Sequence, residues 1–280
     1  MAHHDVIVIG AGAAGMMAAI EAGRRGRSVL VFDHAAAPGE KIRISGGGRC
    51  NFTNTGTRPD RFLSANPRFA VSALARYAPA RFIELVDRYG IAWHEKTLGQ
   101  LFCDGSSSQI INLLTAEMAQ AGVTLMLHTS LSAVERTATG FRLSLSNGEV
   151  TCDALVVASG GKSIPKMGAT ALGYQLATRF GLRVTETRPA LVPLTFEPGM
   201  RERLAPLAGI AADVVVSARR QSFAEAMLFT HRGLSGPAIL QISSYWREGE
   251  AIAIDLLPGF DLSAALRRAR HETPRLALQN

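Results

Sequence analysis

The sequence is poor in the residues that signal a disulfide-bonded or metal-bound protein. It has three cysteines, Cys50, Cys103 and Cys152, and no two of them form a C-x-x-C pair. An odd and unpaired set argues against a disulfide framework and against a zinc site, and it fits a reducing cytoplasm. His3 and His4 are more typical of a frayed chain end than of metal ligands. We therefore expect a cytoplasmic protein without a metal.

Long apolar runs are also missing. No run reaches the length needed to cross a bilayer, and residues 1–5 show no signal-peptide pattern. We therefore expect no membrane partner. Apolar residues make up 47% and charged residues 19% of the sequence, which is the composition of a globular protein. Its 280 residues suffice for one large or two modest domains.

Several catalytic signatures are absent as well. We find no glycosidase-like carboxylate pair, no serine elbow and no P-loop. The net charge of +7 could suggest nucleic acid. The basic residues are mostly scattered arginines, however, and the densest group is Arg267, Arg268 and Arg270. A solvated basic face is the simpler interpretation, so we do not expect a nucleic-acid partner.

The first 33 residues carry the clearest positive signal. Residues 5–10 (D-V-I-V-I-G) predict a buried parallel strand, residues 16–25 predict a helix, and residues 28–33 predict a second strand. Between the first strand and the helix lies a G-x-G-x-x-G motif, and the second strand ends in Asp33. All parts of a dinucleotide-binding β–α–β unit occur in order, which disfavours the alternative of a merely structural glycine turn.

Each part of this unit has its own physical role. Gly10 permits the tight turn, Gly12 lets a pyrophosphate approach the backbone, and Gly15 lets the helix pack closely on the strand. The start of the helix offers N–H groups to the phosphates. Asp33 follows Gly15 by eighteen residues, a spacing that suits a bond to a ribose hydroxyl.

Residues 35–57 predict one long loop without regular structure, and such loops are usually functional. Gly46, Gly47 and Gly48 allow unusual backbone torsions, while Lys41, Arg43 and Arg49 bring positive charge. We expect this loop to contact the cofactor. The alternative is a surface loop that needs no ligand.

The remaining pattern predicts alternating helices and strands. We expect helices over residues 66–89, with Pro79 ending or kinking the first and Ala80 beginning the second, and a serine-capped helix over 109–121. Residues 123–128 predict a third strand of the sheet. Residues 130–150 predict an antiparallel hairpin, and 152–161 a fully buried strand that returns to the carboxyl edge of the sheet. No second G-x-G-x-x-G follows a strand, so no separate nicotinamide domain is expected. Strand-like segments at 191–196, 210–216 and 251–257 suggest a second domain from about residue 190.

Four segments together resemble one known family. They are S-G-G-G-R-C-N-F-T-N (45–54), V-V-A-S-G-G-K-S-I-P-K-M-G-A-T (156–170), P-A-L-V-P-L (189–194) and L-F-T-H-R-G-L-S-G-P-A-I-L-Q-I-S-S (228–244). The sequence is similar to bacterial flavoproteins labelled NAD(P)/FAD-dependent oxidoreductase or aminoacetone-oxidase-type FAD-binding enzyme, which are relatives of a bile-acid dehydro-intermediate reductase. The motifs keep their order over nearly the whole chain.

This resemblance implies an α/β fold: a glutathione-reductase-like Rossmann FAD domain (1–189) with a β-rich insert domain (190–280) that carries part of the substrate side. FAD would be the cofactor and NAD(P)H a possible electron donor. The glycine motif and Asp33 would hold the ADP half, the backbone of Leu131 would meet adenine, and the 41–51 and 158–161 segments would line the rest. The implied cofactor-binding residues are Gly10, Gly12, Ala14, Gly15, Asp33, Lys41, Ser45, Gly46, Gly47, Gly48, Arg49, Cys50, Asn51, Leu131, Ala158, Ser159, Gly160 and Gly161.

The sequence departs from the family pattern in two places. Relatives continue with a C-terminal segment that closes over the flavin, whereas this sequence stops at Asn280. We therefore expect a fragment or a shortened homologue that holds FAD less tightly. Residues 101–104 (L-F-C-D) stand where many relatives have a Phe-Pro pair, which suggests a different substrate.

Two residues are candidates for catalysis. Cys50 lies beside Arg49, which would lower the pKa of its thiol, but we expect no second cysteine near it; simple packing is the alternative. His231 precedes a helix expected over 237–246, with Pro237 in its first turn and Ser235 as its cap. There it could donate a proton to a substrate bound at the helix start, or be an ordinary turn histidine.

We thus predict an FAD-dependent oxidoreductase that moves hydride between a small organic substrate and flavin, with NAD(P) or oxygen as the redox partner. One alternative is an RNA-modifying flavoprotein. The basic pI favours it, whereas an arginine excess without aromatic stacking residues disfavours it. Another is a shortened binding module that holds no flavin.

Overall fold

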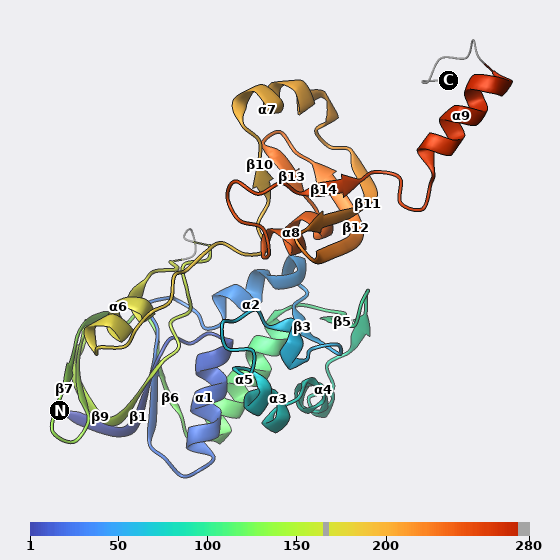
Figure 1. Cartoon of the computed structure of the whole chain (residues 1–280). Helices are drawn as coiled ribbons and strands as arrows, with labels where there is room; N and C mark the ends of the chain where they lie inside the picture. Colours follow the sequence, from blue (N-terminus) through green and yellow to red (C-terminus); the bar gives the residue numbers. More distant parts are fainter. Residues whose placement is uncertain (165–167, 274–280) are drawn as a thin grey trace. The chain divides into compact units, whose positions relative to one another are not determined.

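The computed structural model describes residues 1–164 and 168–273 (Figure 1). The chain divides into two compact units, residues 1–184 and 185–280. The first contains a six-stranded mixed sheet with helices, and the second is rich in antiparallel strands. The predicted α/β class, with a Rossmann-like parallel sheet, is therefore confirmed. In the motif of residues 156–170, Pro165, Lys166 and Met167 lie outside the described residues.

The sheet of the first unit has the strand order β6-β2-β1-β9-β8-β7. Four strands run parallel: β6 (Thr124–Met126), β2 (Val29–Phe32), β1 (Ala2–Ile9) and β9 (Gly148–Val157). Strands β8 (Phe141–Leu145) and β7 (Leu131–Arg136) extend it as an antiparallel half. In register, Val8 lies opposite Val31 on one side and Val156 on the other.

Strand β9 corrects one prediction. The expected hairpin and the expected strand over 152–161 are joined, because β9 runs without a break from the hairpin turn into the parallel half. It ends at Val157 rather than Gly161, and it is not fully buried: Cys152 alone is buried, while Val157 is 44% exposed.

The central strands bury side chains on both faces of the sheet, since successive residues of a strand point to opposite faces. Val8 and Val31 point to the face covered by α1 (Ala13–Gly23) and α5 (Ser108–Gln120). Ile7 and Phe32 point to the other face, which Leu176 of α6 (Leu172–Arg179) helps to cover. Figure 1 shows α1 and α5 packed side by side on their face of the sheet. Such two-sided burial explains the continuous apolar runs of these strands.

The segment 35–57 is not the unstructured loop that its sequence suggested. It contains the helix α2 (Glu40–Ile44), the 3₁₀ turn η1 (Ser45–Gly48) and the strand β3 (Asn51–Asn54). Strand β3 pairs with β5 (Gln100–Cys103), which pairs with β4 (Trp93–Glu95). The helix is only five residues long and the strand has a distant partner, so neither gives a periodic local signal.

Two helix boundaries also differ from the prediction. After η2 (Pro59–Arg61) and α3 (Val71–Arg76), α4 (Pro79–Arg88) begins at Pro79, because the first turn of a helix needs no N–H from that residue. Ser107 stands at the start of α5 without capping it, since its hydroxyl donates instead to the Arg43 carbonyl at 2.8 Å.

The second unit has a five-stranded sheet of order β10-β13-β12-β11-β14. Helix α8 packs on β11 and β12 around Val216, Met227 and Ile239, all buried. The sequence did not predict β12. The elements are β10 (Leu194–Thr195), α7 (Pro198–Leu204), η4 (Ala205–Leu207), β11 (Ala211–Ala218), β12 (Gln221–Phe229), β13 (Gly233–Ser235), α8 (Pro237–Ser243), β14 (Ala253–Asp255) and α9 (Leu262–Glu272).

Helix α8 begins at Pro237 as predicted but ends at Ser243, before Trp246. Its N-cap is Gly236 rather than Ser235, which belongs to β13. Gly236 has φ of +91°, and a Cβ there would lie 2.8 Å from the Ala226 carbonyl oxygen, so only glycine fits the turn.

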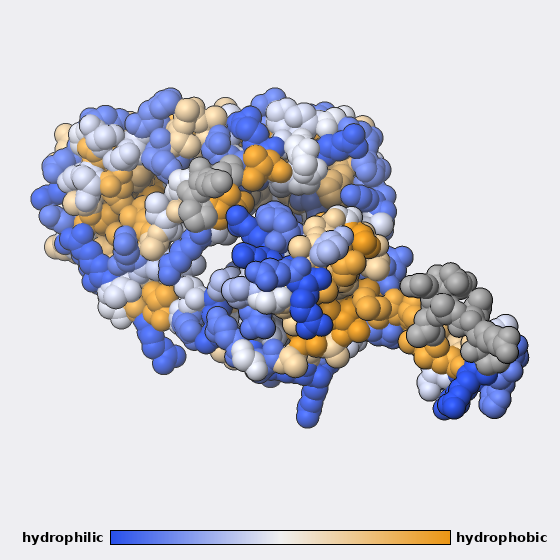
Figure 2. Space-filling view, turned by 90° about the horizontal axis from the view of Figure 1, so that it is seen from above, coloured by the Kyte–Doolittle hydropathy of each residue, from blue (hydrophilic) through white to orange (hydrophobic). Residues whose placement is uncertain are grey.

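Apolar surface gathers where the second unit leads into α9 (Figure 2). The exposed apolar residues of this stretch are Leu256, Leu257, Phe260, Leu262 and Leu266. Arg267, Arg268 and Arg270 also lie on α9 and are exposed. Over the described residues, no helix is both long enough and apolar enough to cross a membrane.

Candidate functional site

A cavity of about 360 Å³ lies where the parallel strands of the first unit end. Residues that follow β1, β2, β6 and β9 all contribute to it, as expected of a ligand site at the carboxyl edge of an α/β sheet. Its lining comprises Ile9, Gly10, Phe32, Asp33, His34, Thr129, Ser130, Leu131, Ser159, Gly168, Thr170, Leu172 and Gln175.

The glycine motif forms a tight cradle beside this cavity. Gly10 has φ of +106°, and a Cβ there would lie 2.7 Å from the Ala158 carbonyl oxygen. A Cβ on Gly15 would lie 1.8 Å from the Gly10 carbonyl oxygen. Gly12 differs, since a Cβ there would meet nothing within 4 Å. Two glycines therefore serve backbone packing, and the third borders open space at the start of α1, where a pyrophosphate would fit.

Asp33 connects the cradle to the cavity. Its Oδ2 accepts a hydrogen bond from the Ala11 N–H at 2.7 Å, and its Oδ1 accepts one from the Ala35 N–H at 2.9 Å. His34 Nδ1 lies 3.2 Å from the same Oδ1. The carboxylate is thus fixed against the glycine loop while it lines the cavity, and its free lone pairs can accept bonds from ribose hydroxyls.

The far end of the cavity is built by the connection from β6 to β7. Thr129 is buried; its N–H donates to the Asp33 carbonyl and its hydroxyl to the Leu127 carbonyl, both at 2.9 Å. These bonds hold Ser130 and Leu131 at the lining. Leu131 therefore lies on the same cavity as Asp33, and its contact with adenine stays a prediction.

Lys41 connects the two segments that were predicted to line the rest of the cofactor, residues 41–51 and 158–161. Its Nζ donates to Ser163 Oγ at 2.9 Å, and a Cβ on Gly160 would lie 3.7 Å from that Nζ. Ala158 donates from its N–H to the Ile9 carbonyl at 2.9 Å, which holds the start of this segment beside β1. A Cβ on Gly161 would lie 2.9 Å from the Tyr174 hydroxyl.

The other predicted residues do not line the cavity. Gly46, Gly47 and Gly48 have φ of +59°, +66° and +87°, and a Cβ on Gly46 would lie 2.6 Å from the Phe102 ring. The Ser45 hydroxyl donates to the Ile42 carbonyl at 2.9 Å. Ala14, Arg49 and Asn51 are exposed. Their roles toward a cofactor stay predictions.

Cys50 does not have the reactive thiol that its neighbour Arg49 suggested. Burial raises the pKa of the Cys50 thiol, and only a hydrogen bond with Ser45 opposes this. A second cysteine does lie near, because the Cys103 N–H donates to the Cys50 carbonyl at 3.4 Å. Burial, with Cys50 adding to it, raises the pKa of Cys103 to about 11. Both thiols stay protonated near neutral pH, which fits packing better than nucleophilic chemistry.

His231 is exposed in the turn between β12 and β13. The Thr230 hydroxyl closes this turn by accepting from the N–H groups of Arg232 at 3.2 Å and Gly233 at 3.1 Å. Strand β13 separates the histidine from the start of α8. His231 is also not among the residues that line the cavity, and its role as a proton donor stays a prediction.

The sequence missed several lining residues. Thr129 and Ser130 could have been found, because they directly follow the strand predicted over residues 123–128. Gln175 and Leu172 on α6 gave no signal, since the path of that helix over the sheet is a tertiary feature. Among the residues that the structure describes, no three or more His, Cys, Asp or Glu side chains are grouped to hold a metal ion.

A family model described as the HI0933-like protein Rossmann domain matches residues 4–251. The chain is 50% identical over 281 residues to a protein of Escherichia coli (strain K12) named ribosomal RNA dihydrouridine synthase. That match covers 100% of this chain and 70% of the other. A Haemophilus influenzae protein of the same name is 44% identical, with coverage of 99% and 70%.

A more distant relative is the 3-dehydro-bile acid delta(4,6)-reductase of Clostridium scindens, 29% identical over 91% of this chain and 65% of that protein. The expected kinship with a bile-acid reductase is thus found. None of these three relatives bears the name of an aminoacetone oxidase.

Proposed function

This chain belongs to the family of the HI0933-like protein Rossmann domain, and from that premise we propose that it is an FAD-dependent oxidoreductase. The flavin, when bound, supplies a hydride. The observation that carries the proposal is the open space at Gly12 beside the fixed carboxylate of Asp33. Gly10, Gly12 and Gly15 would hold the pyrophosphate, Asp33 the ribose, and Leu131 the adenine.

The names of the relatives favour one kind of substrate. Dihydrouridine arises when hydride and a proton add across the C5–C6 double bond of uracil, which is conjugated with a carbonyl group. A delta(4,6)-reductase acting on a 3-dehydro compound reduces double bonds conjugated with a ketone. We infer that this chain reduces a carbon–carbon double bond conjugated with a carbonyl group, with NAD(P)H as the electron donor.

Uridine in ribosomal RNA is the substrate that we favour, because the two relatives so named are the more similar and span nearly the whole chain. The choice is supported by three exposed aromatic residues that the sequence analysis did not single out. Phe62, Phe69 and Tyr77 are exposed, and each directly follows an arginine. We call this set, with Arg61, Arg68 and Arg76, the arginine–aromatic segment.

The segment has the chemistry of a single-strand binder. Exposed rings can stack on bases, and neighbouring arginines can contact phosphates. Charges of both signs lie close to it: burial and Glu21 raise the pKa of Tyr77, while Arg24, Arg81 and Arg88 are near enough to act against this rise. These exposed rings supply the stacking residues whose apparent lack had disfavoured RNA.

The test combines flavin retention with product analysis. We expect the purified chain to show flavin absorbance, to release FAD on denaturation, and, with NADPH under anaerobic conditions, to add two mass units to uridine in a ribosomal RNA fragment. Absence of flavin after reconstitution would support the non-catalytic module instead. Reduction of a steroid dienone but not of RNA would favour a small-molecule substrate, the reading that the Clostridium relative supports.

A matched pair of variants tests the RNA surface. Replacing Arg61, Arg68 and Arg76 by Gln should weaken binding of single-stranded RNA and reduce the slope of log K against log[salt] by about 2, from about 0.7 per lost contact. Replacing Arg136, Arg142 and Arg179, which are exposed elsewhere on the first unit, removes the same charge. Equal weakening by the two triple variants would show that the segment is not the RNA-binding surface.

A further inference from the structure

The second unit contains a cavity of about 640 Å³, larger than the one in the first unit. Strands β10, β12, β13 and β14 form its floor, and Met200 and Leu204 of α7 form one wall. Trp246 and the residues after it form another part of the lining. A volume of this size is typical of sites that enclose a small organic molecule. The resemblance implies that this unit carries part of the substrate side, but it names no ligand and no residue for this cavity.

The lining is apolar over most of its area. Met227 and Leu234 are buried beneath it, and Phe196, Phe229, Ile252 and Ile254 complete the floor. The charged members of the lining are Arg188, Arg247, Glu248 and Glu250. Three of these four come from one short stretch, residues 247–250, so the cavity has a large apolar part and a charged edge.

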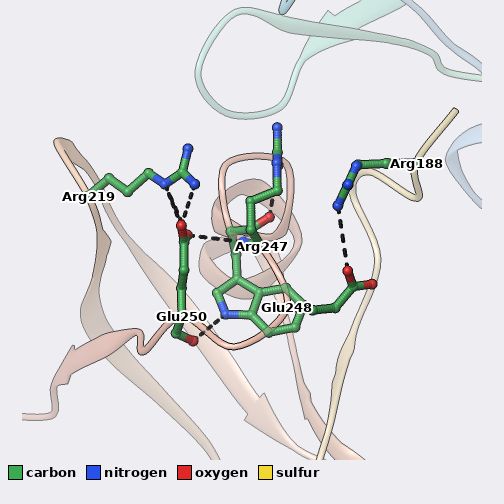
Figure 3. A network of polar contacts seen from close by, with 6 residues as sticks. Arg188, Arg219, Arg247, Glu248 and Glu250 are labelled. Atoms are coloured by element: carbon green, nitrogen blue, oxygen red, sulfur yellow. Dashed lines mark hydrogen bonds and ion pairs between the residues drawn. The ribbon is translucent and has the colours of Figure 1, made fainter. Parts of the chain in front are cut away.

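Both glutamates at this edge lie beside an arginine, and one of these arginines is shared with a third carboxylate, Glu186. Arg219 Nε lies 3.0 Å from each carboxylate oxygen of Glu250, and this bond is the main reason that the pKa of Glu250 is lowered. Arg188 lies 3.5 Å from Glu248 and 3.0 Å from Glu186. Figure 3 shows these two pairs on either side of Arg247.

Arg247 is the arginine of this lining that has no ion pair among the described residues, although its charge helps to lower the pKa of Glu250. Its backbone N–H donates to Glu250 at 3.2 Å, and its Nη1 donates to the Trp246 carbonyl at 2.8 Å. Within the described part of the chain, no carboxylate forms an ion pair with its guanidinium. The Trp246 indole donates to the Glu250 carbonyl at 2.6 Å, which closes the 246–250 loop and fixes the position from which Arg247 projects.

We propose that this cavity binds a small amphipathic carboxylate, with its apolar body against the Met227 floor and its carboxylate on the guanidinium of Arg247. An amine is the wrong partner, because Glu248 and Glu250 already have arginine partners. A planar guanidinium with free donors suits a carboxylate, which it can hold through two parallel hydrogen bonds. The proposal does not depend on flavin binding or on the proposed RNA substrate.

The first test compares three probes of equal chain length by calorimetry on the full chain. Decanoate should bind with a stoichiometry of one and with at least about tenfold higher affinity than decanol, since a charge-assisted hydrogen bond contributes that much. Decylamine should bind more weakly than decanol. Equal affinity for decanoate and decylamine, or no saturable binding of decanoate, would overturn the proposal.

Two matched pairs of variants locate the site. Arg247→Gln should weaken decanoate binding about tenfold and leave decanol unchanged, whereas Arg220→Gln, an exposed arginine of the β11–β12 turn, should change neither. Leu256→Asp should abolish decanoate binding, because Leu256 lines the cavity, while Leu257→Asp should not. These two leucines are 55% and 49% exposed, so both variants should fold. Equal effects within either pair would refute the assignment.

Discussion

At the scale of single residues, two glycines of one motif differ in whether the structure leaves room for a side chain. A methyl group on Gly15 would overlap the Gly10 carbonyl oxygen, whereas one on Gly12 would enter open space. Gly15→Ala should therefore destabilise the protein by about 3 kcal/mol or more, and Gly12→Ala by less than about 0.5 kcal/mol. The proposed function adds that Gly12→Ala loses flavin, while its Tm equals that of the flavin-free wild type. Thermal denaturation of the flavin-free proteins and flavin absorbance measure both; a large drop in Tm of flavin-free Gly12→Ala would contradict the assignment.

The buried thiols give a prediction on pH. Burial raises the pKa of Cys103 and of Cys152 to about 11, so in the folded protein both stay protonated where the same thiols of the unfolded chain ionise. The stability that they contribute is present below pH of about 8.5 and falls as pH rises toward 11. Urea denaturation at pH 8 and pH 10 should show this fall. Fast labelling of native thiols by iodoacetamide at pH 8 would contradict the burial of all three cysteines.

At the scale of elements, a buried charge joins α1 to α5. Glu117 on α5 is 2% exposed; it forms an ion pair with Arg24, just after α1, and accepts a hydrogen bond from the Tyr89 hydroxyl at 2.8 Å. Arg24→Ala should cost about 3 kcal/mol, because it leaves a buried carboxylate without its cation. Arg25→Ala is the control, since Arg25 is 75% exposed and its pair with Glu21 should contribute at most about 0.5 kcal/mol. Adding Glu117→Gln to Arg24→Ala should recover part of the loss in urea denaturation. Equal costs for the two single variants would refute this role of Glu117.

The elements that sequence predicted well are those whose signal is local. The strand, glycine turn, helix and second strand that end at Asp33 follow one another directly in the sequence and each shows its own local pattern, and Asp33 is held by the N–H groups of Ala11 and Ala35. The prediction of an unstructured loop over residues 35–57 was wrong for the opposite reason. Its strand β3 exists only because it pairs with β5, almost fifty residues later, and α2 is too short to show a helical period.

The same distinction explains what could be predicted of the candidate site. Gly10 and Asp33 lie at ends of predicted strands, so their place on one cavity follows from the topology of a parallel sheet. Cys50 and Cys103 looked unrelated because the β3–β5 pairing that brings them together is non-local. The cavity of the second unit could not be predicted from the sequence for the same reason, since its lining comes from four strands and α7.

At the scale of the whole molecule, the two units have separate cores. Two clusters of buried side chains lie in residues 1–184, around Val8 and around Ile7, while a third, around Met227, lies in residues 185–280. Domains with their own cores can unfold independently, so a single free energy of unfolding need not describe the chain.

The two tryptophans allow each unit to be followed alone, because Trp93 belongs to the first and Trp246 to the second. Trp246→Phe leaves Trp93 to report on the first unit, and Trp93→Phe leaves Trp246 to report on the second. We expect different urea midpoints for the two variants. FAD at about 100 times its Kd should add about 2.7 kcal/mol to the transition that Trp93 reports, because the proposed flavin contacts lie in the first unit, and should leave the other unchanged. Coincident midpoints that FAD shifts together would mean that the units unfold as one, and that the cofactor stabilises both.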